Sequence, residues 1–231
     1  MKEKQAVGVL RVVATPIGNL EDITARALRI LSESDYILCE DTRVTGKLLQ
    51  HYEIKTPRRS YHAHSSPAVH QSIISDLENG LAVALVSDAG TPGVSDPGVR
   101  LVSLARGAGV RVETIPGPSS VTAAVAIVGL VGNQFTFLGF APNKKGRQTF
   151  FESLADYPHP VIFFESTHRI IKALDSLALV AEDHKIWLCR ELTKRYEEAL
   201  SGSPAELCDL LIANPEKQKG EFVVIVESRK G

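Results

Sequence analysis

Residues that could do chemistry gather in one loop directly behind an apolar run. The apolar run covers residues 81–86, and the stretch from residue 85 to residue 98 reads LVSDAGTPGVSDPG. Its glycines would let the backbone approach a ligand closely. The spacing of Gly90, Gly93 and Gly98 matches neither GxGxxG nor GxxxxGK(S/T), so nicotinamide binding and P-loop phosphoryl transfer lose support. The loop is expected either to hold a small ligand of another class or to be a cluster of structural turns.

Two further loops also contain glycine and proline and follow predicted strands. They are TPIGNL at residues 15–20 and PGPSS at residues 116–120. In an open parallel sheet, ligands bind beyond the carboxyl ends of the strands, where helix N-termini also favour anions. The three loops are therefore the expected ligand-binding loops.

Two clusters of basic residues could contact a polyanion. One reads KTPRRSYHAH over residues 55–64, and the other reads NKKGR over residues 143–147. The formal net charge is −1, so no global positive field would draw the chain to nucleic acid, and any such binding would be local. For either cluster, an ordinary solvated loop is the alternative.

The elements that must position these residues alternate in type along the first half of the chain. Strands are predicted at residues 7–15, 36–41, 58–63, 81–86 and 111–115. Helices are predicted at residues 22–34 and 45–52, from a Ser66-Pro67 cap to residue 80, and from an Asp96-Pro97 cap to residue 104. Such alternation is typical of βαβ units, which form a parallel sheet with helices on both faces.

A stiff break at residues 116–118, Pro-Gly-Pro, marks the predicted domain boundary. It separates an N-terminal domain at residues 1–117 from a C-terminal domain at residues 118–231. In the second domain, strands are predicted at residues 135–142, 161–166, 185–192 and 221–228. Helices are predicted at residues 119–131, 147–157 and 168–180 and after a Ser203-Pro204 capping box. The alternation is less regular here, so this domain is predicted to be α plus β with a mixed sheet.

Composition limits the class of protein. The chain has 231 residues, of which 44% are hydrophobic and 23% charged, as in an ordinary globular protein. No apolar run reaches the roughly 18 residues of a membrane span, and the start lacks a secretory signal, so a cytoplasmic protein is expected. Cys39, Cys189 and Cys208 are widely separated, which argues against disulfides and against a metal site.

Seven stretches, in order along nearly the whole chain, resemble the tetrapyrrole methylase superfamily. They are TPIGNLEDIT (15–24), CEDTR (39–43), SDAGTPGVSDPG (87–98), PGPSS (116–120), FLGFAP (137–142), ESTHRI (165–170) and RELTKRYEE (190–198). SDAGTPG together with RELTK resembles in particular the ribosomal RNA small subunit methyltransferase I family. Thr167 departs from that pattern, where proline is usual, and is expected to alter only a turn.

The resemblance implies a fold, a cofactor and a reaction. The fold is the tetrapyrrole methylase fold of two α/β domains, with S-adenosylmethionine in a cleft between them, usually in a homodimer. The reaction is methylation of the ribose 2′-hydroxyl of a cytidine in the decoding region of 16S rRNA. The implied cofactor-binding residues are Pro16, Ser87, Asp88, Ala89, Ser119, Ser120, Phe140 and Ala141.

Methyl transfer to a hydroxyl needs help from charged groups. Charge disappears at the reacting centre, which favours a partly dehydrated site, and the hydroxyl must share its proton with a base or lie near a cation. The candidates are Glu40, Asp41, Arg43, Glu165, Arg169, Glu191 and Lys194, and the predicted catalytic groups are Glu40, Arg43 and Lys194. For Glu40, Asp41 and Arg43, and for Glu165 and Arg169, a local ion pair is the structural alternative. For Glu191 and Lys194 the alternative is a surface role.

RNA is usually recognised at unpaired nucleotides by stacking and by contacts to the 2′-hydroxyl. The predicted substrate-binding residues are Arg58, Arg59, Tyr61, Lys144, Lys145 and Arg147. Because the chain is nearly neutral, a preformed small ribosomal subunit, docked by its shape, is the expected partner rather than loose RNA.

Two other functions fit the same sequence. One is methylation of a tetrapyrrole carbon, which the implied fold would permit although RELTK and SDAGTPG argue against it. The other is a non-catalytic RNA-binding or ribosome-assembly role with a vestigial pocket.

Overall fold

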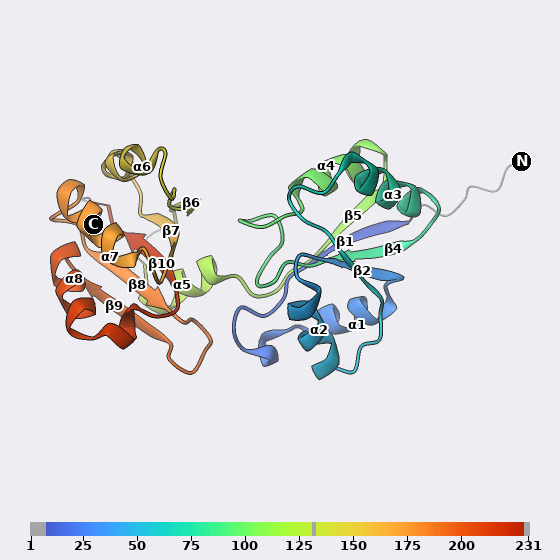
Figure 1. The fold of residues 1–231 in the computed structure, drawn as a ribbon, viewed down its shortest axis with the longest axis horizontal. Helices are drawn as coiled ribbons and strands as arrows, with labels where there is room; N and C mark the ends of the chain where they lie inside the picture. The colour runs from blue at the N-terminus through green and yellow to red at the C-terminus, as the bar shows by residue number, and fades with distance from the viewer. Residues whose placement is uncertain (1–7, 131–132, 229–231) are drawn as a thin grey trace, which may run out of the picture. The chain divides into compact units, whose positions relative to one another are not determined.

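The computed structural model describes residues 8–130 and 133–228, which divide into two compact units (Figure 1). The first unit is Met1–Ser119 and the second is Ser120–Gly231. The boundary expected between residues 117 and 118 lies beside this division. Two predicted elements extend past the described residues, since the first strand was expected to begin at Val7 and the helix after residue 119 to end at Val131.

The first unit is built on an all-parallel sheet in the order β3-β2-β4-β1-β5. Its strands are β1 (Val9–Val13), β2 (Tyr36–Cys39), β3 (Arg58–Ser60), β4 (Ala82–Leu85) and β5 (Arg111–Ile115). Its helices are α1 (Ala25–Glu33), α2 (Thr42–His51), α3 (Pro67–Glu78) and α4 (Val99–Gly107), with a short 3-10 turn at Leu20–Asp22. The predicted parallel sheet is confirmed.

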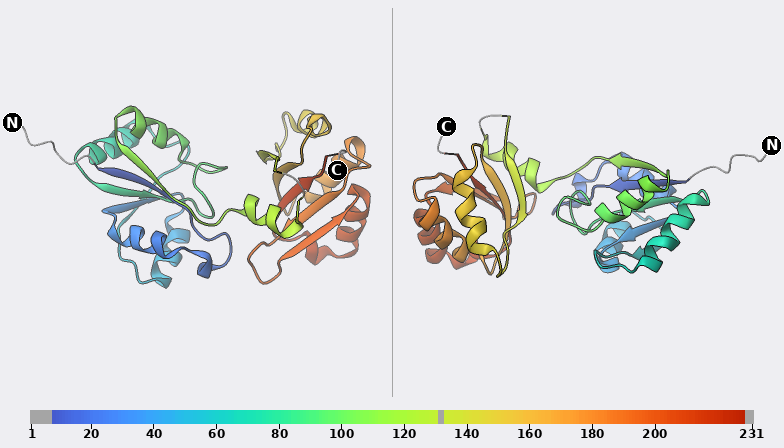
Figure 2. Two further views of the ribbon diagram at one scale, coloured as in Figure 1. Left: turned by 180° about the vertical axis from the view of Figure 1, so that it is seen from behind. Right: turned by 90° about the horizontal axis from the view of Figure 1, so that it is seen from above.

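Both faces of this sheet are covered by helices, as Figure 2 shows from two further sides. Alternate residues of β2 point to opposite sides: Tyr36 and Leu38 pack with residues of α3 and α4, whereas Ile37 packs with residues of α1 and α2. Burial on both faces explains why strands such as β4 are apolar along their whole length.

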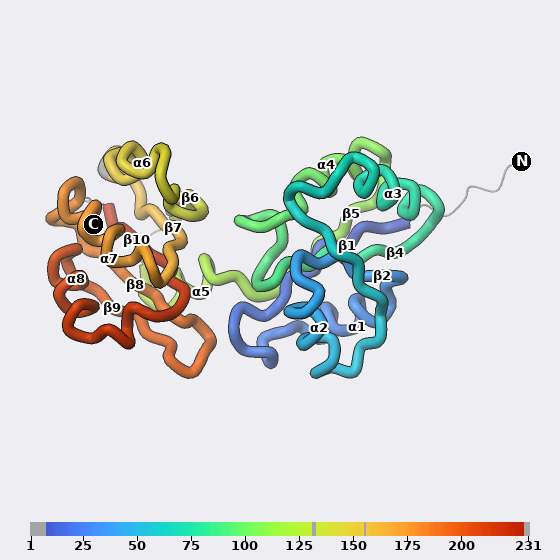
Figure 3. Tube along the Cα trace, viewed as in Figure 1, coloured from blue at the N-terminus to red at the C-terminus, as the bar shows by residue number. Residues whose placement is uncertain are grey.

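Side-chain caps start three of the four helices. The Thr24 hydroxyl, the Asp41 carboxylate and the Ser66 hydroxyl each accept a hydrogen bond from a backbone N–H in the first turn. The prediction that Asp96-Pro97 would cap α4 is wrong. Gly98 precedes that helix with φ 139°, a conformation that favours glycine, and no side chain caps it. A long loop, residues 86–98, therefore separates β4 from α4 (Figure 3).

The second unit has a mixed sheet in the order β6-β7-β10-β8-β9, as predicted. Its strands are β6 (Thr136–Phe140), β7 (Val161–Ser166), β8 (Ile186–Arg190), β9 (Glu198–Gly202) and β10 (Glu221–Val226). Its helices are α5 (Ser120–Val128), α6 (Arg147–Ser153), α7 (Ile170–Val180) and α8 (Pro204–Ala213), with 3-10 turns at Leu154–Asp156 and Pro215–Gln218. Only β6 and β7 pair in parallel, and the other neighbours pair antiparallel.

One strand of this sheet was missed in the sequence. The β9 strand reads EALSG, which contains no β-branched or aromatic residue and so lacks the usual strand signal. It forms because it returns antiparallel along β8, pairing Arg190 with Glu198 and Ile186 with Gly202.

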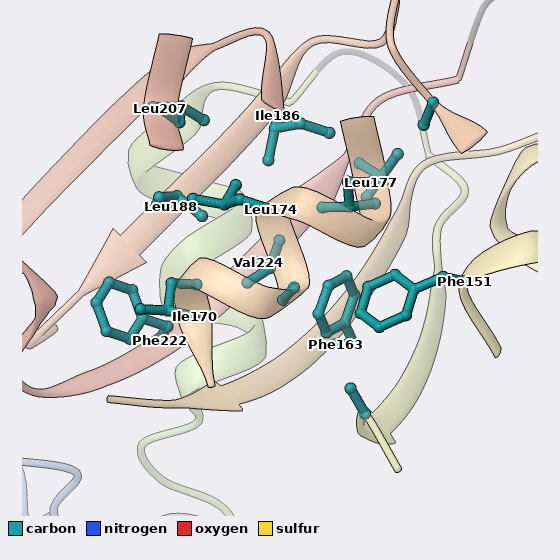
Figure 4. Packing of buried hydrophobic residues seen from close by; sticks show 14 of the residues in the cluster. Phe151, Phe163, Ile170, Leu174, Leu177, Ile186, Leu188, Leu207, Phe222 and Val224 are labelled. Carbon is teal, nitrogen blue, oxygen red and sulfur yellow. The ribbon is translucent and has the colours of Figure 1, made fainter. Parts of the chain in front are cut away.

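The core of the second unit lies between one face of its sheet and the helices α6, α7 and α8. Phe151 and Phe163 pack edge to face with ring centroids 5.9 Å apart, beside Leu174 and Leu177 of α7 (Figure 4). The predicted Ser203 capping box at the start of α8 is present, with the Ser203 hydroxyl and the Glu206 carboxylate each accepting from the other residue's N–H. Within residues 8–130 and 133–228, no helix combines the length and hydropathy that crossing a membrane requires.

Candidate functional site

The three glycine- and proline-rich loops of the first unit meet at the carboxyl edge of its sheet. Thr15 and Gly90 exchange two backbone hydrogen bonds, of 2.9 and 3.0 Å, and so join the loop after β1 to the loop after β4. The Thr91 hydroxyl donates to the carbonyl of Pro118 at 3.3 Å, which ties in the loop after β5. The structure therefore brings together the loops that the sequence singled out. We call this region, residues 14–18, 40–41, 87–98 and 116–119, the first rim.

Ser87 is a buried, hydrogen-bonded residue of the first rim, whereas the next two residues are exposed. Ser87 is buried, its carbonyl accepts from the Thr15 hydroxyl at 3.2 Å, and its own hydroxyl donates to the carbonyl of Ala89 at 3.2 Å. Asp88 and Ala89 are exposed. One oxygen of Asp88 accepts from the N–H of Asp41 at 2.9 Å, which leaves its second oxygen open to a ligand.

Asp96 is a rim carboxylate that sequence reasoning passed over. Burial raises the pKa of the Asp96 carboxyl, and the nearby charges of Glu40 and Asp88 raise it further, while a hydrogen bond from Ser87 acts against them. A proton acceptor with a raised pKa holds a transferred proton more strongly. The sequence carried no signal for this role, because the burial and the neighbours of Asp96 come from distant parts of the chain.

Arg43 is committed to a local ion pair. Its guanidinium contacts the Asp41 carboxylate at 2.6 Å, and Asp41 also accepts from the Arg43 N–H at 2.7 Å as the cap of α2. The hydrogen bonds from Arg43 hold the pKa of the Asp41 carboxyl well below its usual range. Arg43 is otherwise highly exposed, and Glu40 beside it is half-buried.

The second unit offers a comparable edge. Because β10 is antiparallel to both β7 and β8, the strands β6, β7 and β8 all point the same way and their carboxyl ends share one edge of the sheet. The register places Glu165 and Arg190 on either side of Phe222. We call the residues at this edge, 141–147, 166–169 and 191–197, the second rim.

A buried carboxylate with two guanidinium partners supports the second rim. The Glu165 side chain has no solvent exposure and contacts Arg147 at 3.0 Å and Arg169 at 2.8 Å. The same two arginines donate to the carbonyls of Pro142 and Ala141, at 3.1 Å each, and Arg169 also bonds the Asn143 side chain. The side chain of Arg147, which was predicted to bind RNA, is only 16% exposed and holds the loop that carries the exposed Lys144 and Lys145.

Lys194 lies between two carboxylates. Its ammonium contacts Glu191 at 3.0 Å and Glu221 at 2.8 Å. Burial acts to lower the pKa of Lys194, but the hydrogen bonds to these carboxylates outweigh it and raise that pKa. Lys194 therefore stays protonated at neutral pH and fixes the turn after β8.

Phe140 is accessible to a ligand, whereas Ala141 is not. Phe140 is 55% exposed and packs edge to face on Phe164 at 5.1 Å. Ala141 is buried, its N–H donates to the carbonyl of Phe164 at 3.2 Å, and its carbonyl accepts from Arg169. Ala141 therefore has no free donor, and Phe140 is the part of this segment that a ligand can reach. The other predicted cofactor residues, Pro16, Ser119 and Ser120, are half-buried.

The prediction that Tyr61 stacks on RNA is wrong. Its side chain is 2% exposed, and its hydroxyl lies 3.1 Å from the buried ring of His70. Arg59 nearby packs over Tyr36, 3.7 Å from the ring centroid, and donates to Asp76 at 2.7 Å. Of this basic cluster, Arg58 and Arg59 remain exposed.

No metal centre is formed in the part of the chain that the structure describes, where no three His, Cys, Asp or Glu side chains come together suitably. Cys39 and Cys189 are buried free thiols, and burial raises the pKa of Cys189 to about 12, which makes that thiol inert.

Comparison with known proteins gives consistent results. The family model described as Tetrapyrrole (Corrin/Porphyrin) Methylases matches residues 9–208. The proteins named "Ribosomal RNA small subunit methyltransferase I" from Xylella fastidiosa and Escherichia coli O157:H7 are 47% and 42% identical to this chain. These alignments cover 95% and 100% of this chain and 81% and 82% of the relatives.

Solved structures with a similar fold have little sequence in common with this chain. The uroporphyrin-III-C-methyltransferase from Thermus thermophilus has a TM-score of 0.66 at 19% identity, covering 95% of this chain and 94% of that one. A diphthine synthase has a TM-score of 0.71 at 15% identity, covering 96% and 90%. Likeness at this level of identity concerns the fold alone.

Proposed function

The chain belongs to the tetrapyrrole methylase family and, within it, to the ribosomal RNA small subunit methyltransferase I family, and from this membership we propose that it methylates 16S rRNA with S-adenosylmethionine as donor. We further propose that the acceptor is the ribose 2′-hydroxyl of a cytidine in the decoding region. The observation that carries the proposal is the 42–47% identity to the methyltransferase I relatives over nearly the whole chain. The structural neighbours whose names concern tetrapyrroles reach only 15–19% identity.

Each rim, taken by itself, offers groups that suit the proposed cofactor. The first rim offers main-chain groups around Pro16 and Ala89 and one open carboxylate oxygen on Asp88, which suits an amino or ribose hydroxyl group of a nucleoside amino acid. In the second unit, the exposed ring of Phe140 suits a flat purine. We propose that Ser87 keeps the loop in shape and that Ser119 and Ser120 contribute hydroxyls. Ala141 contributes by holding Phe140 in place.

When bound, S-adenosylmethionine supplies an activated methyl group, and the chain must position the acceptor and manage its proton. The part of the chain in this reaction would be to hold a carboxylate that accepts the proton of the ribose hydroxyl. Among the predicted catalytic groups Glu40 is the carboxylate, and we propose it as a base together with Asp96, whose raised pKa favours holding that proton. Arg43 and Lys194 remain the predicted cations, although both already have carboxylate partners.

Transfer of a labelled methyl group tests the reaction. Purified protein and radiolabelled cofactor are incubated with 30S particles, with 16S rRNA alone and with a porphyrinoid. We expect label in the 30S sample, on a single cytidine whose 3′ phosphodiester bond resists alkali because the 2′-oxygen is methylated. Label in the porphyrinoid would favour the tetrapyrrole alternative, and cofactor binding without transfer to any acceptor would favour a non-catalytic RNA-binding role.

The catalytic assignments are tested separately with Glu40→Gln, Asp96→Asn and Lys194→Ala. A variant that binds the cofactor normally and transfers methyl groups at the wild-type rate removes that residue from the mechanism. The predicted homodimer is checked by sedimentation at assay concentration.

A further inference from the structure

The turn after β8, residues 191–197, has a strained backbone. Glu191 and Thr193 have φ values of 49° and 65°, in the left-handed region that favours glycine. For the β-branched Thr193 this conformation is a genuine outlier. Such strain persists only where the surroundings enforce it, and it concentrates at functional sites.

Three sets of hydrogen bonds enforce the strained conformation. Glu191 donates its N–H to the carbonyl of Glu221 and accepts from the Glu221 N–H with its side chain, both at 3.1 Å. The Lys194 ammonium bridges the side-chain carboxylates of Glu191 and Glu221. The Thr193 N–H donates to the Glu197 carboxylate at 2.6 Å.

Arg190, at the end of β8, holds the backbone of the turn in place. Its side chain is almost buried and donates to the carbonyls of Tyr196, at 3.3 Å, and Lys219, at 2.9 Å. It also contacts the Glu198 carboxylate at 2.9 Å. The backbone on which Tyr196 stands is therefore fixed to the sheet.

At its tip the turn presents Arg195 and Tyr196 to solvent. The Tyr196 side chain is 63% exposed, whereas Tyr36 and Tyr61 are buried. The Arg195 guanidinium lies 5.6 Å from the centre of the Tyr196 ring. Within residues 8–130 and 133–228, Arg195 makes no ion pair.

Each acidic residue of the turn has a hydrogen-bond donor, but Glu197 keeps its negative charge because its donor is a neutral backbone N–H. Glu191 is bound by Lys194, Glu197 by the Thr193 N–H, and Glu198 by Arg190 and Lys217. The second rim carries two more exposed cations, Lys144 and Lys145, on the loop that Arg147 and Arg169 hold.

We propose that Arg195 and Tyr196 form the stacking platform for an unpaired nucleotide of the RNA substrate. The inference rests on the proposed function and deepens it. An aromatic ring and a planar guanidinium are the two side-chain surfaces on which unpaired RNA bases stack. A platform already held in place loses little conformational freedom on binding, which accounts for the strain and the anchoring bonds beneath it. It takes the role that the buried Tyr61 cannot perform.

A comparison of Tyr196→Leu with the conservative variant Tyr196→Phe tests the proposal. Tyr196→Leu keeps an apolar side chain but removes the π face, and it should weaken binding to 30S particles about 10-fold. Tyr196→Phe keeps the π face and should bind within about 2-fold of wild type. Arg195→Lys, which keeps the charge but loses the planar group, should also weaken binding. Affinity for S-adenosylmethionine and the melting temperature should not change in any of the three.

The salt dependence separates stacking from charge. Lys144→Ala should lower the slope of log affinity against log salt by about one, as the loss of one phosphate contact does. Tyr196→Leu should lower the affinity and leave that slope unchanged. Equal binding by Tyr196→Leu and Tyr196→Phe would overturn the proposal.

Cross-linking separates RNA from protein as the partner of the platform. With a photoreactive phenylalanine analogue in place of Tyr196, irradiation of the 30S complex should attach the chain to 16S rRNA. Attachment to a ribosomal protein, or no attachment, would overturn the proposal while leaving the methyl-transfer activity of the wild type intact. Absence of wild-type methyl transfer to 30S particles would be the failure of the proposed function itself, and this inference would fall with it.

Discussion

Individual carboxylates of this protein owe their properties to neighbours from other parts of the chain. Asp96 is partly buried near Glu40 and Asp88, which raises its pKa, whereas Asp41 is bound by Arg43, which lowers its pKa. Glu165 is fully buried and held by two arginines. The same acidic group is thus a poised proton acceptor, a helix cap or a structural anchor, depending on what surrounds it.

Asp96→Asn should increase the free energy of unfolding at pH 7. A carboxyl whose pKa is raised by folding binds its proton more readily in the folded state, so its contribution to stability falls as pH rises from the ordinary pKa through the raised one. Asparagine is neutral throughout and removes this loss. Urea unfolding at pH 7 and at pH 3.5 should show a gain at pH 7 that largely disappears at the lower pH.

Asp41→Asn is the matched comparison, with the opposite sign. The lowered pKa of Asp41 means that its contribution is present above the ordinary pKa and lost as pH falls through the lowered one. Asparagine keeps a cap on α2 but loses that contribution, so this variant should be less stable than wild type at pH 7. Destabilisation by Asp96→Asn at pH 7 would contradict the burial and repulsion described for that residue.

Glu165→Gln should lower the free energy of unfolding by about 3 kcal/mol, because it leaves two largely buried guanidinium groups without their counter-charge. Urea denaturation measures the change. Glu152→Gln on the exposed surface of α6 is the control and should alter stability by less than about 0.5 kcal/mol. Similar urea midpoints for the two variants would show that the ion pairs of Glu165 with the two arginines do not stabilise the fold.

The strands of the second unit are held together by hydrogen bonds between their turns as well as by strand pairing. The Thr167 hydroxyl, in the turn after β7, donates to the carbonyl of Gly220 at 2.7 Å and accepts from its N–H at 2.9 Å. Gly220 lies just before β10, and a side chain there would meet Glu191, since its Cβ would lie 2.6 Å from the Glu191 side chain. The departure from proline at Thr167 therefore does more than alter a turn: it links the end of β7 to the start of β10.

Thr167→Val should destabilise the protein by about 1–2 kcal/mol, because the isosteric side chain fills the same space but satisfies neither backbone group of Gly220. Thr167→Ser keeps the hydroxyl and should lose much less. Thermal or urea unfolding measures both, and amide exchange at Gly220 should be faster in the valine variant alone. Equal stability of the two variants would argue that solvent replaces the Thr167 hydroxyl without cost.

The whole chain folds as two units, each with a core of its own. The buried residues of the first unit form two clusters, one on each face of its sheet, and those of the second unit pack under α6, α7 and α8. A defect in one core should therefore be felt first within its own unit.

Leu174→Ala tests this separation. Leu174 is fully buried in α7, and its truncation should cost about 3 kcal/mol. Faster amide exchange should be concentrated in residues 133–228, with residues 8–119 protected as in wild type. Leu179→Ala on the same helix, where the side chain is 87% exposed, is the control and should change little. Equal acceleration in both units would show that the chain unfolds as one body.

Local sequence patterns determined most of the architecture. Apolar runs and caps such as Ser66-Pro67 and Ser203-Pro204 predicted the strands and helices of both units, because each pattern reports which face of an element is buried and where its first turn begins. The glycine-rich loops were recognisable for the same reason, since turns have local chemistry.

Only the tertiary structure decided which of the conspicuous residues are available to a ligand. It placed Tyr61 in the core, engaged Arg147 with Glu165, partly buried Asp96 near Glu40, and built β9 on a segment with no strand signal. Each of these outcomes depends on a partner brought close by sheet register and strand order, and a pattern confined to neighbouring residues does not encode that proximity.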